Sequence, residues 1–282
     1  MTEDARPAGG ALPQIPLGPY SVSRLIAGSN TINGGTHLSR FLNLQMREYF
    51  TEEQTLAFLR RCEDVGINTW QSGPPNFPLL EKHRAAGGRL QYISLAVNDP
   101  ADPDSLAKVA AARPIGIAHH GEVTDRFFKE GAFEQVREFC KRVRDTGVPV
   151  GVSTHMPAVV EHIEEHGWDV DFFMCCVYER HRSEAELKAL LGHVPIPVRE
   201  VYLKEDPPRM FRAVREARKP CLAFKILAAG RVCDRQESVE QAFRETFSQI
   251  KPSDAVIVGM YPRYEDQAAI NAAYVRRFGG HP

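Results

Sequence analysis

Eight short apolar segments, separated by helical patterns, run along almost the whole 282-residue chain, and this alternation constrains the fold most strongly. Each segment is nearly continuous in apolar residues, as in parallel strands that are covered on both faces. The predicted strands are residues 24–29, 67–71, 91–97, 115–120, 148–154, 171–177, 221–226 and 255–259. Because no linker interrupts the alternation, the pattern predicts an α/β protein with one TIM-type (β/α)8 barrel. A two-domain, doubly wound protein is the alternative, but no G-x-G-x-x-G motif follows the first strand.

The N-terminal region is predicted to add a short β-hairpin to the barrel. Residues 15–18 and 22–24 form two extended segments around a Gly-Pro turn, and the hairpin would close the bottom of the barrel. The residues before them include charges, prolines and glycines and lack the apolar core of a signal peptide. We therefore expect a mobile N-terminus over residues 1–14 and a single barrel domain over residues 15–282.

Charge and cysteine content restrict the partners and the compartment. The chain has 35 Lys and Arg against 36 Asp and Glu, a net charge of −1, which excludes a globally basic nucleic-acid binder. No apolar run is long enough to cross a membrane. The six cysteines include no C-x-x-C pair, so they are interpreted as buried thiols in a reducing compartment. We expect a cytoplasmic protein with a small-molecule partner and no nucleic-acid or membrane partner.

Several motifs follow one another as they do in aldo-keto reductases. The segments are IPLG at 15–18, DVGINTW at 64–70, GVSTH at 151–155, KILAAGR at 225–231 and VIVG at 256–259. Together with the later Gln267 and Asn271, they resemble that family over nearly the whole chain. The resemblance also implies a (β/α)8 barrel, and it implies NADPH-dependent reduction of a small carbonyl or sugar-like compound.

The catalytic positions of that family are matched only in part. Its members use Asp, Tyr, Lys and His at the strand ends to deliver a proton to the carbonyl oxygen. The Asp position falls on Gln71, the Tyr position on Asn76 and the Lys position near residues 95–96. The His position matches His120 or its neighbour His119. Because neither an amide nor an alanine can donate that proton, a reductase built on this chain needs another acid.

The cofactor positions are also altered. The resemblance places Ser153 and Thr154 where the family holds the nicotinamide carboxamide. It places Phe224 loosely at the ring that stacks on the nicotinamide, and Arg263 and Asn271 in the loop that binds phosphate. The resemblance therefore permits NADP as cofactor without requiring it.

Two strand-end residues are candidate catalytic groups in their own right, because chemistry in such barrels lies at the C-terminal ends of the strands. Gly116 and Ala118 are small and share a face with His120, so His120 is predicted to point inward and His119 toward the helices. Lys225 lies in an otherwise apolar strand, where it loses hydration unless a carboxylate or substrate pairs with it. It is interpreted as an anion binder or a Schiff-base amine, with a snorkelling or ion-paired structural lysine as the alternative.

A metal site is a further hypothesis. It would combine His120 and His155 with Glu122 or Glu179, since imidazole and carboxylate ligands suit zinc or manganese. No H-x-H or H-E-x-x-H spacing supports it, so we expect no metal.

Two long connections are predicted between the regular elements. Residues 30–50 form a long loop after the first strand, which is interpreted as a lid with His37 reaching inward, a surface excursion or a protomer contact. Residues 193–206 are predicted to form a second insertion without regular structure.

Three functions remain open from the sequence. The first is an NADPH-dependent oxidoreductase with a rearranged acid. The second is a lyase, isomerase or hydrolase that uses His120 and Lys225, with or without a metal. The third is a non-catalytic binding barrel. We expect an enzyme, because a merely structural barrel rarely carries two such polar groups at its strand ends.

Overall fold

The computed structural model describes residues 11–98, 102, 104–196 and 198–280. Within these residues, eight parallel strands close into a barrel in the order β10-β3-β4-β5-β6-β7-β8-β9. The strands are β3 (Leu25–Gly28), β4 (Thr69–Ser72), β5 (Gln91–Ala96), β6 (Gly116–His119), β7 (Val150–Thr154), β8 (Phe172–Cys176), β9 (Cys221–Phe224) and β10 (Ala255–Gly259). Each overlaps one predicted segment, so the predicted (β/α)8 barrel is confirmed.

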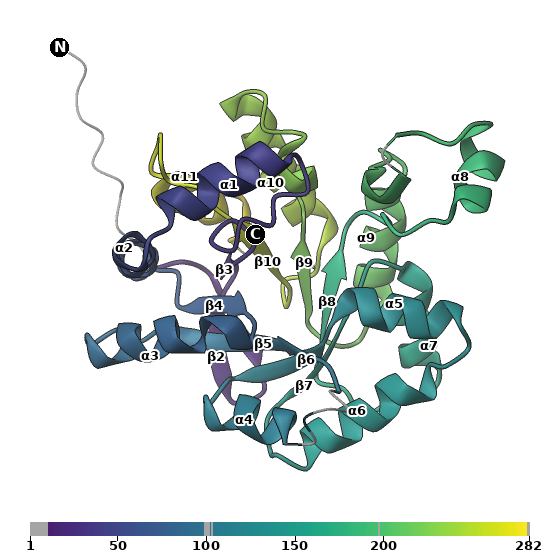
Figure 1. Ribbon diagram of the computed structural model, residues 1–282, viewed down its shortest axis with the longest axis horizontal. Helices are drawn as coiled ribbons and strands as arrows, with labels where there is room; N and C mark the ends of the chain where they lie inside the picture. Colours follow the sequence, from purple (N-terminus) through teal and green to yellow (C-terminus); the bar gives the residue numbers. More distant parts are fainter. Residues whose placement is uncertain (1–10, 99–101, 103, 197, 281–282) are drawn as a thin grey trace.

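Helices surround the ring of strands (Figure 1). They are α1 (Arg40–Tyr49), α2 (Glu52–Asp64), α3 (Phe77–Ala85), α4 (Ser105–Ala111), α5 (Gly121–Lys129), α6 (Glu134–Arg144), α7 (Pro157–Glu165), α8 (Glu184–Leu191), α9 (Asp206–Glu216), α10 (Gln236–Gln249) and α11 (Gln267–Phe278). Short 3-10 turns occur at η1 (Pro74–Asn76), η2 (Val198–Glu200) and η3 (Ala228–Gly230). Ser183 and Glu186 form a capping box at the start of α8, which satisfies two backbone N–H groups there. Among the described helices, none has the length and apolar character required to cross a membrane.

A two-stranded hairpin closes the lower end of the barrel, as predicted. β1 (Gln14–Leu17) pairs antiparallel with β2 (Tyr20–Ser23) across a turn in which Gly18 has φ of 57°. Glycine adopts this left-handed conformation without steric cost. Ile15 and Leu17 pack with the interior residues at the N-terminal ends of the barrel strands. The hairpin thus shields that end of the interior from water.

The domain begins earlier than the sequence predicted. Residues 1–10 of the expected mobile segment lie outside the described residues. Leu12, however, is only 3% exposed and packs in the core, and Gln14 already begins β1. The barrel domain therefore extends to residues before the predicted boundary at residue 15.

The seam between the first and last barrel strands is reinforced by a buried arginine. β10 pairs with β3 from Val256 to Gly259. Arg24 lies just before β3, and its guanidinium donates to the carbonyl oxygens of Lys251, Asp254 and Gly279 at 2.7–2.9 Å. These bonds fix the C-terminal segment against the start of the first barrel strand.

One aromatic side chain in the barrel interior has room only because two neighbouring residues are glycines. Phe172 of β8 is fully buried among the interior side chains. A Cβ atom at Gly151 would lie 2.3 Å from this ring, and a Cβ at Gly116 would lie 2.8 Å from it. The aromatic ring therefore occupies the space that side chains at positions 116 and 151 would take.

Replacing Gly151 by Ala should lower the free energy of unfolding by about 1–3 kcal/mol, because the added methyl group overlaps the Phe172 ring. Urea unfolding followed by circular dichroism measures the loss. In a Phe172→Leu background, the further loss caused by Gly151→Ala should be smaller, because the obstructing ring is gone. Losses that simply add would contradict this contact.

Candidate active site at the strand ends

Two neighbouring histidines stand where strand β6 ends: His119 is its last residue, and His120 is the N-cap of α5. Ala118 packs in the barrel interior, as the predicted alternation requires. His120 lies near the charged groups of the strand-end face, since the charges of Glu122, Lys225, Asp125 and Arg180 act on its pKa. His119 faces the helices: its ring lies 4.7 Å from that of Phe139, and its Nδ1 lies 2.7 Å from Oγ1 of Thr124. His119 is therefore a packing residue, whereas His120 belongs to the strand-end face.

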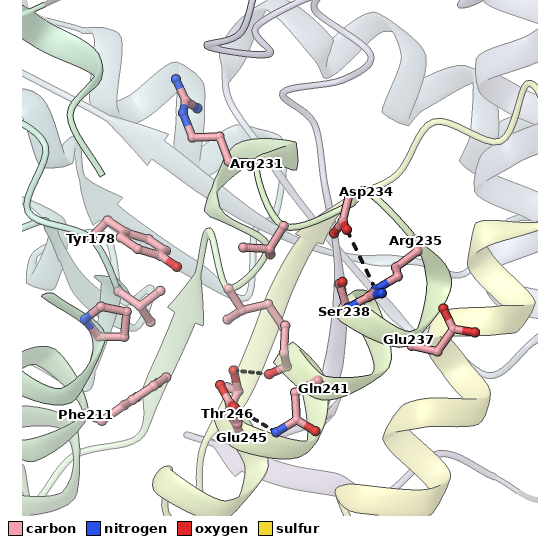
Figure 2. A pocket seen from close by; sticks show the side chains of 15 residues that line it. Tyr178, Phe211, Arg231, Asp234, Arg235, Glu237, Ser238, Gln241, Glu245 and Thr246 are labelled. Atoms are coloured by element: carbon pink, nitrogen blue, oxygen red, sulfur yellow. Dashed lines mark hydrogen bonds and ion pairs between the residues drawn. The ribbon is translucent and has the colours of Figure 1, made fainter. Parts of the chain in front are cut away.

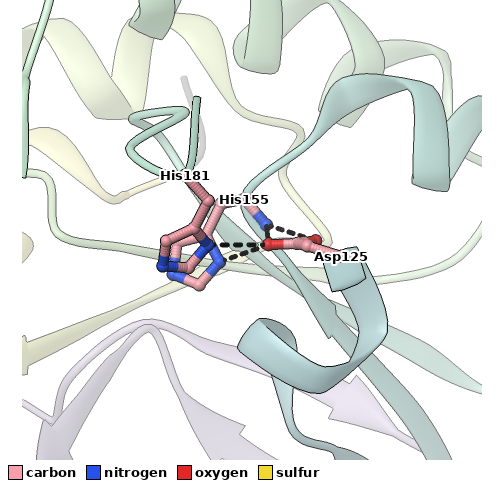
Figure 3. A group of neighbouring side chains, drawn as sticks. All are labelled: Asp125, His155 and His181. Carbon is pink, nitrogen blue, oxygen red and sulfur yellow. Dashed lines mark hydrogen bonds and ion pairs between the residues drawn. The ribbon is translucent and has the colours of Figure 1, made fainter. Parts of the chain in front are cut away.

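A buried aspartate of α5 organises the polar side chains on this face. The Asp125 side chain is 2% exposed, and its Oδ1 accepts a hydrogen bond from Oγ1 of Thr154 (2.5 Å). His155 contacts the same carboxylate through its backbone N–H (3.2 Å) and its ring Nδ1 (2.7 Å). Nδ1 of His181 lies 3.3 Å from Oδ2, so both imidazoles face one oxygen (Figure 3). Burial opposes ionisation of Asp125, but these hydrogen bonds outweigh it and hold the pKa of the carboxyl below its usual range.

A chain of charged groups continues from this carboxylate across the face. Nε2 of His181 lies 3.3 Å from Oε1 of Glu122, and the hydrogen bond from His181 holds the pKa of Glu122 below its usual range. The buried Arg180 pairs with Glu122 and, at 3.0 Å, with Glu200 of η2. Oε1 of Glu200 also lies 3.1 Å from Nδ1 of His37. The chain thus links α5 and the loops that follow β3 and β8.

The loop after β8 is held in place by a buried ion pair. Arg182, two residues after Arg180, donates to both carboxylate oxygens of Asp206 at the start of α9. Both side chains are buried, with exposures of 7% and 2%. This pair fixes the backbone that presents Arg180 and His181 to the face.

Lys225 lies at the end of β9 and lines a cavity of about 590 Å³. Its backbone is left-handed, with φ of 59°, which is uncommon for a residue other than glycine. Nζ lies 5.4 Å from the centre of the Phe224 ring, and none of the described carboxylates hydrogen-bonds it. The cavity is bounded by residues that follow β3, β9 and β10 and by one side of α1. The amine therefore reaches a space large enough for a small metabolite.

Burial lowers the pKa of several titratable nitrogens on this face, whereas the pKa of His181 is raised, because its hydrogen bonds to Asp125 and Glu122 outweigh burial. Burial lowers the pKa of Lys225, and the nearby Arg180 charge lowers it further, although Cys176, Glu200 and Glu122 oppose the shift. Burial also lowers the pKa of His120, and it lowers the pKa of His155 to about 3 and that of His37 to about 4. In the last two cases, the positive charge that Lys225 carries when protonated lowers the imidazole pKa further.

The loop after β3 covers the cavity. It contains α1, a helix that the sequence analysis did not predict, and Leu42, Gln45 and Met46 of this helix line the cavity. The loop is tied down through His37, whose carbonyl oxygen accepts a hydrogen bond from Arg231 at 2.9 Å. The predicted second insertion also contains regular structure, since η2 forms within it and carries Glu200.

The two amides predicted as catalytic residues have different surroundings. Gln71 lines the cavity, and its Nε2 donates to the carbonyl oxygen of Ser72. Asn76 is buried, and its amide nitrogen donates to Oγ of Ser72 (2.6 Å) and Oδ1 of Asn33 (3.1 Å). Asn76 therefore ties the turn after β4 to the loop after β3.

The residues predicted to bind a cofactor do not form one group. Phe224 and Asn271 line the cavity. Ser153 is buried in β7, and the Thr154 hydroxyl is bonded to Asp125. Arg263 lies beside Tyr261 and Tyr264, outside the lining of the cavity.

Asp125 and Glu200 were not candidates from the sequence. A signal existed for Asp125, because Gly121, Thr124 and Asp125 repeat at helical spacing on the buried face of α5. A carboxylate on such a face requires partners. No comparable signal marks Glu200, whose role depends on how the insertion folds back over the barrel.

A second cavity, of about 400 Å³, lies between α9 and α10 outside the barrel (Figure 2). Its charged and polar side chains interact with one another: Asp234 with Arg235 at 3.8 Å and Gln241 with Glu245 at 2.7 Å. The strand-end cavity is the stronger candidate, because it contains Lys225 and lies where such barrels carry their chemistry.

Comparisons with known proteins agree with the fold. No protein-family model matches the chain, and a search of curated proteins finds no match. A truncated 3-deoxy-D-arabino-heptulosonate 7-phosphate synthase from Thermotoga maritima is 13% identical, with a TM-score of 0.53, 95% of this chain and 91% of that chain covered. A glycerol dehydrogenase from Gluconobacter oxydans, an aldo-keto reductase, is 12% identical, with a TM-score of 0.53 and coverages of 96% and 91%. A mandelate oxidase is 14% identical, with a TM-score of 0.52 and coverages of 94% and 75%.

These similarities show a TIM barrel and nothing narrower. An aldo-keto reductase is one of several enzymes with similar structures, beside a synthase and an oxidase. At sequence identities of 12–14%, the roles of residues in those proteins cannot be assigned to residues of this chain.

Replacing Asp125 by Ala should destabilise the protein by about 3–5 kcal/mol, because Thr154 and His155 then lose a buried charged acceptor. Asp125→Asn should cost less, since its amide oxygen still accepts from Thr154. Thermal and urea unfolding measure both, and Asp145→Ala on the surface serves as the control. Equal losses for the two Asp125 variants would contradict the role assigned to the acceptor oxygens.

Proposed function

We propose that this barrel is an enzyme, a lyase or isomerase that acts on a small carbonyl compound and uses Lys225 to form an imine with it. One observation carries the proposal. Lys225 combines a pKa lowered by burial, no hydrogen-bonded carboxylate among the described residues, and a position in the strand-end cavity. A desolvated lysine close to another cation is the usual form of an activated amine nucleophile.

The chemistry follows from a neutral amine. Nζ of Lys225 attacks the carbonyl carbon, a C–N bond forms, and the carbonyl oxygen leaves as water after taking up protons. The protonated imine withdraws electrons, so a neighbouring C–H or C–C bond is broken more easily. His120 lies close enough to Lys225 for their charges to interact, and its pKa is lowered. As a neutral imidazole it is suited to accept a proton from the substrate and return it.

The surroundings favour a small polar substrate. The cavity combines the apolar Phe224, Leu42 and Met46 with the polar Gln71 and Asn271. The charged chain from Glu122 to His37 lies beside it and offers donors and acceptors for hydroxyl or carboxylate groups. A compound with a carbonyl and one or more further oxygen groups matches this lining.

Borohydride trapping tests the imine. The protein is incubated with glyceraldehyde, dihydroxyacetone or pyruvate as probes and then reduced with sodium borohydride. Reduction converts the imine into a stable secondary amine. We expect at least one probe to label Lys225, as located by intact-mass and peptide mass spectrometry. Because burial lowers the pKa of Lys225, labelling should reach its plateau at a pH below 10.4, the ordinary lysine value.

Two variants serve as controls for this experiment. Lys225→Met should remove the label at the mapped position while leaving the circular dichroism spectrum unchanged. Lys204→Met removes a lysine whose side chain is 93% exposed and should leave the labelling of Lys225 unchanged. Labelling that is confined to surface lysines would overturn the proposal.

NADPH-dependent reduction is the second candidate. It is supported by Phe224 and Asn271, which line the cavity where the aldo-keto reductase resemblance places cofactor contacts. It is opposed by Asn76 and Thr154, whose polar groups are bonded within the protein, and by Gln71 in place of an acid. Titration of the protein with NADPH, followed by fluorescence and thermal unfolding, tests whether the protein binds this cofactor. Quenching that saturates and is weakened in Phe224→Ala favours a reductase, whereas no fluorescence change and no thermal shift rejects it.

A further inference from the structure

We propose that Asp125, His155 and His181 bind a first-row divalent metal ion at the strand ends. The three residues come from α5, from the end of β7 and from the loop after β8, and their side chains point toward one another (Figure 3). The proposal is independent of imine formation, because it concerns a different group of side chains.

The geometry brings three ligand atoms to one point. One atom from each residue lies within 4.8 Å of the others. Oδ2 of Asp125 is 2.7 Å from Nδ1 of His155 and 3.3 Å from Nδ1 of His181. Bonds of about 2.0–2.2 Å to a shared ion place neighbouring donor atoms roughly 3–3.5 Å apart. To hold an ion, the distance from Asp125 to His155 must lengthen by a few tenths of an ångström. The distance from Asp125 to His181 already lies in this range.

Supporting hydrogen bonds around these ligands are also present. The Thr154 hydroxyl donates to Oδ1 of Asp125, and the His155 backbone N–H donates to both carboxylate oxygens at 3.2 Å. These bonds fix the carboxylate with Oδ2 facing the two imidazoles. Nε2 of His181 faces Oε1 of Glu122 at 3.3 Å, the arrangement in which a carboxylate orients a ligating histidine. Arg180 in turn pairs with Glu122 and fixes it.

The donor set indicates the class of ion. Two imidazoles and one carboxylate suit Zn²⁺, Mn²⁺ or Fe²⁺ rather than Mg²⁺ or Ca²⁺, which prefer oxygen ligands. Three protein ligands leave coordination positions open for water or for an oxygen of a substrate. Glu122 and Glu200 add negative charge nearby, which offsets the charge of Arg180.

A proton is the competing occupant. An imidazolium at His181 between Asp125 and Glu122 would use the same atoms without any ion. The two arrangements differ in a measurable way, because only the metal site binds a stoichiometric amount of metal.

Calorimetric titration of the full-length protein tests the proposal. The protein is treated with EDTA, dialysed, and titrated separately with Zn²⁺ and Mn²⁺, and Co²⁺ is added as a spectroscopic probe. We expect one equivalent of metal to bind and Co²⁺ to show ligand-field bands from nitrogen and oxygen ligands. Asp125→Asn, His155→Ala and His181→Gln should each weaken binding by more than ~100-fold, whereas Glu122→Gln should weaken it by about 10–100-fold.

Matched controls separate this site from adventitious binding and from the proposed reaction. His162 and His166 form a stacked pair on α7 and at its end, with ring centres 3.9 Å apart, so His166→Ala tests surface histidines. That variant and Lys225→Met should bind metal like the unchanged protein. His181→Gln alters a half-buried side chain and guards against loss of folding at the buried positions. Absence of stoichiometric binding, or binding unaffected by both His155→Ala and His181→Gln, would overturn the metal site.

Discussion

The pairing of β10 with β3 is the contact on which the rest of the structure depends, because it closes the eight strands into a barrel. Parallel strands gain their hydrogen bonds only after long connections are ordered, so the last strand must find the first across the whole chain. Arg24 strengthens this seam by bonding three carbonyl oxygens of the C-terminal segment. Once the ring is closed, residues from separate βα units face one another, as Asp125 of α5, His155 after β7 and His181 after β8 do.

Within that ring, the buried carboxylate of Asp125 determines how the polar face is arranged. A carboxylate removed from water is stable only with several donors, and these come from different elements. Thr154 and His155 belong to β7 and its end, whereas His181 belongs to the loop after β8. The requirement to satisfy one charge therefore fixes the relative positions of three elements. The ion pair of Arg182 with Asp206 holds the third of them from the other side.

The strands of the barrel could be predicted from the sequence, whereas helix α1 and the contacts of Asp125 could not. The same physical reasons explain both outcomes. Strands covered on both faces appear as continuous apolar runs, and strict alternation correctly placed His119 toward the helices. Helix α1 was not predicted, although Leu42, Met46 and Tyr49 repeat at helical spacing and pack against the core. Two exposed apolar residues on its other sides, Phe41 and Leu44, obscure this periodicity in the sequence. The contact of Asp125 with His181 joins residues 56 positions apart. No local sequence pattern indicates such a contact, because it depends on how α5 and the loop after β8 pack against each other.

The backbone after β9 argues that Lys225 is held for a purpose other than stability. Lys225, Ala228 and Ala229 all have positive φ, between 48° and 59°, although none is glycine. Such residues cost of order 1–3 kcal/mol each and persist only where the surrounding structure imposes them. Glycine would relieve the strain at position 225 but would remove the amine. The strained turn instead places the amine, without a hydrogen-bonded carboxylate among the described residues, at the cavity that His37 also lines. A lysine that served only the fold would gain more from an ordinary strand conformation and a carboxylate partner.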